Sequence, residues 1–206
     1  MTDIALQNDA NAAPLVAAIR AALQRRSIVL VGMMGVGKSS IGRRLAARLA
    51  VPFVDADSEI EKAADMSIPD IFARHGEPYF RSGEARVIGR LLDNGPQVLA
   101  TGGGAFMNEA TRAAIKAKGV SIWLSAEFDV LVRRIAKRKN DRPMLQTDDP
   151  AETLRQLLKV REPVYALADI TVQSRETPHD AIVGEIVTAL AAYINVTAPA
   201  EHKDGA

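Results

Sequence analysis

The sequence predicts an α/β protein in which a parallel β-sheet carries helices on both faces. Two observations support this fold class. Short apolar runs of strand character alternate with segments of helical periodicity, as in repeated β–α–β units. A glycine-rich turn also stands between the first apolar run, Ile28–Val31, and the helical pattern behind it. Ligands of such folds bind at the carboxyl ends of the strands, so functional residues are expected there.

Three parts of the chain are expected. Residues 1–26 are interpreted as a leader, flexible over 1–13, with a short amphipathic helix from Pro14 to near Arg26 that packs on the domain. Residues 27–195 form the main domain, and 196–206 a disordered polar tail. The expected strands are Ile28–Val31, Pro52–Asp55, Val98–Thr101, Val120–Leu124 and Asp169–Val172. The expected helices are Ser39–Ala50, Ser58–Ala64, Pro69–Arg74, Glu84–Leu92, Glu109–Lys118, Glu127–Lys139, Ala151–Leu158 and His179–Ile194.

Composition narrows the function classes. A length of 206 residues with 48% hydrophobic and 25% charged residues suits one globular domain, and a net charge of +1 gives no sign of a general nucleic-acid binder. The absence of cysteine excludes disulfides and thiolate catalysis. No apolar run is long enough to span a membrane, and the first residues lack a signal-peptide pattern. We therefore expect a cytoplasmic monomer that binds neither nucleic acid nor membrane.

The most specific motif is a phosphate-binding loop. The pattern G-x-x-x-x-G-K-S occupies residues 32–39, after a strand and before a helix, with a further glycine at Gly35. Glycines bring backbone N–H groups against phosphate oxygens, and the N-terminus of the next helix adds its positive dipole end. Lys38 can reach the β and γ phosphates, and Ser39 can ligate Mg²⁺. The motif predicts a nucleotide site.

Two carboxylates, Asp55 and Asp57, follow the second expected strand, and period-two alternation turns both to the same side. Asp55 could hold Mg²⁺ together with Ser39, and Asp57 could accept the proton of an attacking hydroxyl. The alternative is that both acids cap the next helix and complement its dipole. The upstream phosphate loop favours the functional interpretation.

A run of three glycines, Gly102–Gly104, follows the third expected strand. Without side chains, the backbone can approach a ligand closely, although a flexible turn is the alternative. Arg81 and Arg161 lie in segments that look like turns or helix starts. Singly, each is typical of a solvated surface residue, whereas as a pair they could bind a carboxylate bidentately.

A basic run occupies residues 133–142, with six cations in ten positions. A solvated helix end explains such a run through the helix dipole. Nucleic-acid binding is a second interpretation, but no aromatic residues interleave for stacking on bases. In a third interpretation, the run belongs to a mobile lid whose arginine stabilises the phosphoryl group during transfer.

Taken together, these motifs resemble those of the shikimate kinase family, over about residues 27–193. The matching segments, in the family's order, are Gly32–Ser39, Asp55-x-Asp57, Phe80-Arg81-x-x-Glu84, Gly102–Gly104, Arg142-Pro143-x-Leu145 and Arg161-x-Pro163-x-Tyr165. The resemblance implies a three-layer P-loop kinase fold, similar to nucleoside monophosphate kinases, with a five-stranded parallel sheet. It also implies ATP and Mg²⁺ as cofactors and shikimate as substrate. The implied reaction phosphorylates the shikimate 3-hydroxyl and gives shikimate 3-phosphate and ADP, a step of chorismate and aromatic amino-acid biosynthesis.

The resemblance further implies a role for each matching residue, and a lid near residues 140–149. Catalytic roles fall on Lys38, Asp57 and Arg142. Residues implied to bind ATP are Gly35, Val36, Gly37, Lys38, Ser39, Ser40, Arg134, Arg142 and Pro178, with Arg134 stacking on adenine. Residues implied to bind shikimate are Asp57, Arg81, Gly103, Gly104 and Arg161, with Glu84 orienting Arg81. Mg²⁺ is assigned to Ser39 and Asp55.

Two other functions stay open at this point. Another small-metabolite kinase of the same fold, such as a gluconate kinase, would share the phosphate loop but need not carry both arginines. A catalytically silent nucleotide- or RNA-binding module would use the basic run instead. A GTP-binding switch is disfavoured, because the chain has no Asn-Lys-x-Asp motif.

Overall fold

The computed structural model describes residues 3–136 and 149–196. Five strands form one parallel sheet, as expected, and their order is β2-β3-β1-β4-β5. Arg142, residues 140–148 of the expected lid and residues 197–206 of the expected tail lie outside the described residues. The strands are β1 (Ser27–Val31), β2 (Phe53–Asp55), β3 (Val98–Ala100), β4 (Gly119–Ser125) and β5 (Ile170–Gln173).

The phosphate-binding loop follows the central strand. All five residues of β1 are buried, because helices cover both faces of the sheet and β-branched and leucine side chains fill both sides. In the register, Ala100 of β3 is opposite both Leu30 of β1 and Asp55 of β2. The carboxyl ends of β1, β2 and β3 are therefore level, and the segments that leave them are neighbours.

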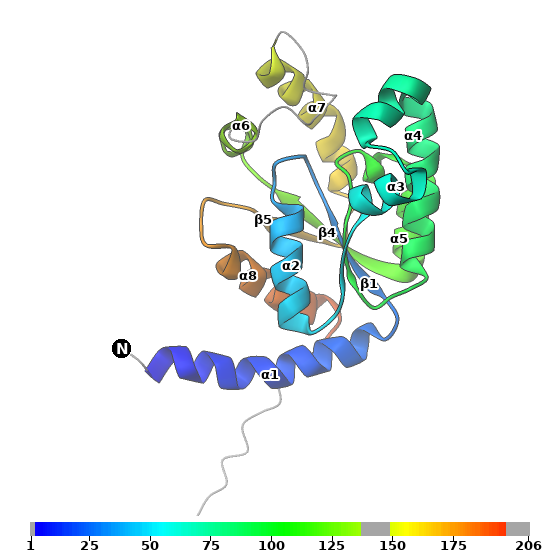
Figure 1. The fold of residues 1–206 in the computed structure, drawn as a ribbon. Coiled ribbons are helices and arrows are strands. Elements are labelled where there is room, and N and C mark those ends of the chain that lie inside the picture. Colours follow the sequence, from blue (N-terminus) through cyan, green and yellow to red (C-terminus); the bar gives the residue numbers. More distant parts are fainter. Residues whose placement is uncertain (1–2, 137–148, 197–206) are drawn as a thin grey trace, which may run out of the picture.

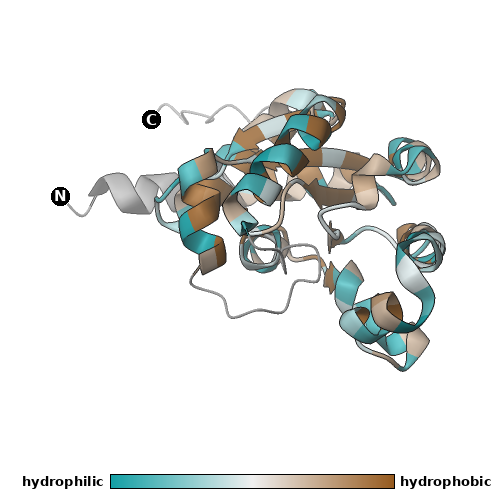
Figure 2. Ribbon diagram, turned by 90° about the horizontal axis from the view of Figure 1, so that it is seen from above, coloured by the Kyte–Doolittle hydropathy of each residue, from teal (hydrophilic) through white to brown (hydrophobic). Residues whose placement is uncertain are grey.

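Helices cover the two faces of the sheet, which gives the predicted three layers (Figure 1). One layer contains α2 and α8, and the other contains α4 and α5. In Figure 2 hydrophobic residues concentrate along the strands between these layers. The helices are α1 (Asp3–Leu23), α2 (Lys38–Leu49), α3 (Ala56–Ala64), α4 (Ile68–Leu92), α5 (Glu109–Lys118), α6 (Phe128–Ala136), α7 (Pro150–Tyr165) and α8 (His179–Tyr193), with a 3₁₀ turn η1 (Ala105–Met107).

The N-terminal helix is longer than expected. It begins at Asp3 rather than at Pro14, so the expectation of a flexible segment over residues 1–13 is wrong for residues 3–13. The alanines, leucine and glutamine of this segment are good helix formers, and they outweigh the asparagines and aspartates. The last turns of α1 pack against α2 and α8, and Ile19 and Leu23 are completely buried there.

Two further helices differ from the sequence expectation. α4 consists of two helical parts divided at Gly76, whose φ of 80° is not helical, so both expected helices are present, but the second begins before the expected Glu84. The second part restarts near Pro78, since proline is well tolerated in a first helical turn. In α7 the helix continues to Tyr165, past the expected end at Leu158, although Pro163 lies inside it. As a result, both arginines of the expected pair lie on helices, Arg81 on α4 and Arg161 on α7.

No helix within residues 3–136 and 149–196 combines the length and apolarity that crossing a membrane requires.

Candidate active site

A cavity of about 620 Å³ lies where β1, β2 and β3 end. Its walls come from the phosphate-binding loop, α3, α4, the triple-glycine loop and α7. Most of the predicted site residues line it. These are Gly35, Gly37, Lys38, Ser39, Ser40, Asp55, Asp57, Arg81, Gly103, Gly104 and Arg161. Val36, Arg134 and Pro178 are not among the lining residues.

The phosphate-binding loop has the backbone that its glycines permit. Gly32, Gly35 and Gly37 have φ values of 130°, 82° and 101°, a region that strains any residue with a Cβ atom. Gly37 caps α2, so the loop runs directly into the positive end of that helix. The Lys38 ammonium donates to the carbonyl oxygens of Gly32 (2.7 Å) and Met33 (3.0 Å) and lies over the loop. The predicted strand–loop–helix context is confirmed.

Ser39 and Asp55 are hydrogen-bonded at the foot of the cavity. The Ser39 hydroxyl donates to Asp55 Oδ2 at 2.7 Å, while Asp55 Oδ1 accepts from the backbone N–H of Asp57 at 3.2 Å and caps α3. The capping alternative is therefore correct for Asp55, which nevertheless also faces the cavity. A hydroxyl and one carboxylate suit Mg²⁺, which binds few protein oxygens and completes its shell with phosphates and water. No cluster of three or more His, Cys, Asp or Glu that could hold a metal occurs among the described residues.

Asp57 lies in the first turn of α3 and not on a strand end, because that helix begins at Ala56 rather than Ser58. Glu84 of α4 approaches it over Gly102. A Cβ atom placed on Gly102 would lie 2.8 Å from Asp57 Oδ1 and 2.7 Å from Glu84 Oε1. Burial raises the pKa of Glu84, the nearby Arg81 opposes this, and the negative charge of Asp57 adds to the increase.

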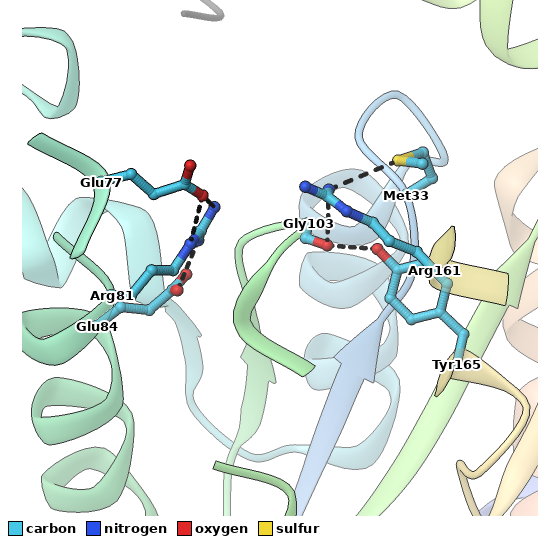
Figure 3. Close-up of polar contacts among 7 residues, drawn as sticks. All are labelled: Met33, Glu77, Arg81, Glu84, Gly103, Arg161 and Tyr165. Carbon is cyan, nitrogen blue, oxygen red and sulfur yellow. Dashed lines mark hydrogen bonds and ion pairs between the residues drawn. The ribbon is translucent and has the colours of Figure 1, made fainter. Parts of the chain in front are cut away.

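Arg81 is held between two carboxylates (Figure 3). Its Nη1 donates to Glu84 Oε2 at 2.7 Å, and its Nε and Nη2 donate to Glu77 Oε1 at 3.1 and 3.0 Å. Burial lowers the pKa of Arg81, but the attraction of Glu84 and Glu77 outweighs burial and the net change is upward. The guanidinium therefore stays charged and has a fixed orientation.

Arg161 enters the site from the opposite wall, on α7 (Figure 3). Only 5% of it is exposed, so the interpretation of a solvated surface arginine is wrong for this residue. Its Nη1 donates to the carbonyl oxygen of Gly103 at 3.2 Å, and the hydroxyl of Tyr165 donates to the same oxygen. Burial raises the pKa of Tyr165 to about 12, which keeps it a neutral donor. Sequence reasoning named Tyr165 only as part of a motif, because one tyrosine has no pattern of its own.

The triple-glycine loop lies against these side chains. A Cβ atom on Gly104 would lie 2.6 Å from three atoms of the Arg81 guanidinium, and one on Gly103 would lie 3.3 Å from the backbone N of Met34. Gly102 and Gly104 thus face predicted functional side chains, and Gly103 faces the phosphate-binding loop. The loop faces the cavity, as the functional interpretation required, and a side chain at Gly102 or Gly104 would displace the groups around it.

Arg134 contacts the phosphate-binding loop from outside the cavity. Its Nη1 donates to the carbonyl oxygen of Val36 (3.1 Å) and to Ser174 Oγ (2.8 Å), and its Nη2 donates to the carbonyl oxygen of Arg175 (2.7 Å). Pro178 is the N-cap residue of α8. Sequence reasoning missed Ser174, since an isolated serine after a strand gives no signal.

A central strand that runs into a G-x-x-x-x-G-K-S loop, beside a cavity with carboxylates and two arginines, defines a P-loop phosphotransferase. The family model "Shikimate kinase" matches residues 34–191. The chain belongs to the shikimate kinase family.

Known relatives agree with this assignment. A shikimate kinase of Bradyrhizobium diazoefficiens is 66% identical over 176 residues, which cover 85% of this chain and 84% of the relative. The structure of "Shikimate kinase from Acinetobacter baumannii in complex with shikimate" is 35% identical with a TM-score of 0.79, covering 84% of this chain and 97% of that one. A gluconokinase of Sinorhizobium meliloti 1021 is 21% identical with a TM-score of 0.58, covers 83% of this chain and 94% of that one, and shares the fold.

Proposed function

We propose that the protein transfers the γ-phosphoryl group of ATP to the 3-hydroxyl of shikimate and forms shikimate 3-phosphate and ADP, a step of aromatic biosynthesis. One observation carries this proposal. The phosphate-binding loop and two arginines from opposite walls share one cavity with Asp57. Membership of the shikimate kinase family supports the same reaction.

On the nucleotide side, the main-chain N–H groups of the loop and the start of α2 suit the triphosphate, and Lys38 supplies a positive charge beside them. Three hydrogen bonds hold the edge of the Arg134 guanidinium. Its flat faces are then suited to stacking on adenine, and Pro178 would line the adenine pocket. Ser39 and Asp55 would hold Mg²⁺. When bound, this ion supplies charge neutralisation at the phosphate oxygens.

On the acceptor side, Arg81 and Arg161 would bind the shikimate carboxylate, because a guanidinium pairs with a carboxylate bidentately. Gly103 and Gly104 let the substrate approach the backbone. Asp57 would then orient the 3-hydroxyl and accept its proton as the oxygen attacks phosphorus. Phosphoryl transfer needs mainly positioning and charge stabilisation, so these fixed groups are the chain's principal contribution.

Exclusion of water from the site is part of the proposal, since bound ATP would otherwise be hydrolysed. A lid near residues 140–149 and its Arg142 remain predictions for this role. That the protein acts as a monomer also remains a prediction. The cytoplasmic location remains a prediction from the sequence.

The nucleic-acid alternative receives little support from the described part of the basic run. Arg133 forms an ion pair with Glu176 at 3.2 Å, and Arg134 is bound to the backbone. These contacts occupy charges that phosphate contacts to RNA would need.

The test is an ADP-release assay with ATP and Mg²⁺, in which shikimate, gluconate and nucleoside monophosphates are offered separately. We expect release that depends on shikimate alone, with a product identified by NMR as phosphorylated at the 3-oxygen. Release with gluconate or a nucleoside monophosphate but not with shikimate would refute the proposal, as would salt-sensitive RNA binding without any phosphorylated product.

A further inference from the structure

Val36 is the residue between Gly35 and Gly37 of the phosphate-binding loop, and it is completely buried. Its carbonyl oxygen accepts two hydrogen bonds from outside the loop. One comes from the Ser174 hydroxyl at 2.8 Å and the other from Arg134 Nη1 at 3.1 Å. Arg134 Nη1 also donates to Ser174 Oγ at 2.8 Å, so the three groups form a closed set. The loop is therefore attached to α6 and to the segment after β5.

Ser174 is itself firmly held. It follows β5 directly, only 1% of it is exposed, and its backbone N–H donates to the carbonyl oxygen of Ser125 at 2.6 Å, which continues the pairing of β5 with β4. The strand order separates β5 from β1 by β4. Ser174 thus connects the outer part of the sheet to a loop that follows its central strand.

Peptide geometry gives this contact a consequence inside the cavity. In a planar trans peptide, the carbonyl group of one residue and the N–H of the next point in opposite directions. Fixing the Val36 carbonyl toward Ser174 therefore fixes the Gly37 N–H on the other side of that peptide. Gly37 has a φ of 101° and lines the cavity. Because glycine adopts several backbone conformations at little cost, contacts from outside the loop restrict this peptide to one orientation.

We propose that Ser174 is a positioning residue for nucleotide binding. Through the Val36 carbonyl, its hydroxyl holds the Val36–Gly37 peptide so that the Gly37 N–H is directed at a phosphate oxygen. The inference rests on the proposed function, because it takes the anion of this loop to be the phosphate chain of ATP or ADP. Ser174 does not line the cavity and acts only through the backbone.

The test measures ADP binding by calorimetry, without shikimate, for the full-length protein and three variants. Ser174→Ala removes the donor, and the loss of one hydrogen bond in a buried set should weaken ADP binding at least about fivefold. Ser174→Cys keeps the size of the side chain but donates weakly, so it should bind ADP as poorly as the alanine variant. In steady-state assays, both variants should raise KM for ATP and leave KM for shikimate unchanged.

Ser121→Ala is the matched control. Ser121 is also a buried serine of this sheet, and its hydroxyl donates to Asp169 Oδ2 at 2.6 Å, but it lies on β4 away from the loop. Loss of the Ser121 hydroxyl should lower the midpoint of thermal unfolding about as much as Ser174→Ala does, but ADP binding should be unchanged.

Three results would overturn the proposal. The first is ADP binding by Ser174→Ala equal to that of the wild type. The second is recovery of binding in Ser174→Cys, which would mean that only side-chain volume matters. The third is an equal loss of binding in Ser121→Ala, which would indicate general destabilisation. Since ADP binding is measured without an acceptor, failure of this inference is distinct from failure of the enzyme to phosphorylate shikimate.

Discussion

Arg81 illustrates how a single side chain is prepared for a ligand. Burying a guanidinium is costly, and here two carboxylates compensate for the lost hydration. The same two partners fix its orientation, so little side-chain entropy remains to be lost when a carboxylate binds. If Arg81 binds the shikimate carboxylate as proposed, the ion pair with Glu84 contributes to substrate binding without requiring Glu84 to contact the substrate.

Asp57 is the residue whose chemistry is most directly testable. If it accepts the proton of the attacking hydroxyl, Asp57→Asn should lower kcat by at least about 10²-fold, in line with typical general-base contributions. ADP binding should stay as in the wild type, because Asp57 is outside the phosphate-binding loop. Rapid-quench kinetics and calorimetry measure the two quantities. Near-normal kcat in this variant would remove Asp57 from its proposed role.

His179, the first residue of α8, should show a pH dependence of known sign. Burial lowers its pKa below the usual 6.5, and the positive charges of Arg44 and Arg134 add to this, while Asp180 opposes it. The unfolded chain then binds the proton more readily than the folded chain. The stability that His179 contributes is complete above pH 6.5 and is lost as the pH falls through the lowered pKa.

NMR titration of the imidazole should locate this pKa below 6.5, with the resonance assigned through His179→Gln. Arg44→Gln should move it upward, since one neighbouring positive charge is removed. A midpoint at or above the usual value in the wild type would contradict the expected sign.

At the scale of elements, the sequence predicted which helices and strands exist better than it predicted where they begin and end. All five strands were expected at nearly their observed positions, because β-branched runs bounded by glycine or proline identify buried strands locally. Two helix bounds were not predicted. The second part of α4 begins near Pro78 rather than at Glu84, and α7 persists past Leu158 although a proline inside a helix usually ends it. The burial of Arg161 depends on that persistence, so it could not be predicted from neighbouring residues.

The close contact between the triple-glycine loop and α4 predicts the effect of one methyl group. Gly104 has a φ of −102°, which alanine adopts easily, but the new Cβ atom would lie 2.6 Å from the Arg81 guanidinium. Gly104→Ala should therefore fold normally and displace that group. A displacement of this kind should lower kcat/KM for shikimate by about 10²-fold.

Gly89→Ala is the control on α4 itself, because nothing lies within 4 Å of its added Cβ atom. This variant should be more stable by about 1 kcal/mol and keep the kinetics of the wild type. Equal kinetics for the two alanine variants would show that the loop does not constrain Arg81.

At the scale of the whole molecule, the site was predictable because parallel strands present their carboxyl ends at one edge. Sequence motifs after β1, β2 and β3 had to meet there, and they do. That the helix before β1 packs on the domain was expected from its apolar spacing, but its packing partners, α2 and α8, were not, because that spacing does not identify the surface that a helix covers. The structure makes the end of α1 part of the hydrophobic core.

Leu23→Ala tests this role of α1. Leu23 is 1% exposed, and removal of a buried leucine side chain should lower the free energy of unfolding by about 2–5 kcal/mol. KM for both substrates should not change, because Leu23 precedes β1 whereas the cavity lies beyond its other end. Urea denaturation measures the loss, with Leu167→Ala, at a 66% exposed position, as the control. A loss below that of the control would mean that α1 is dispensable for folding.

The arrangement around Gly102–Gly104 bears on inhibitor design. A compound that rests on this loop touches main-chain atoms, which no amino-acid replacement can remove. Any side chain introduced at Gly102 or Gly104 would collide with Asp57 and Glu84 or with Arg81. A substitution at either position that weakened the inhibitor would therefore also lower the activity of the enzyme.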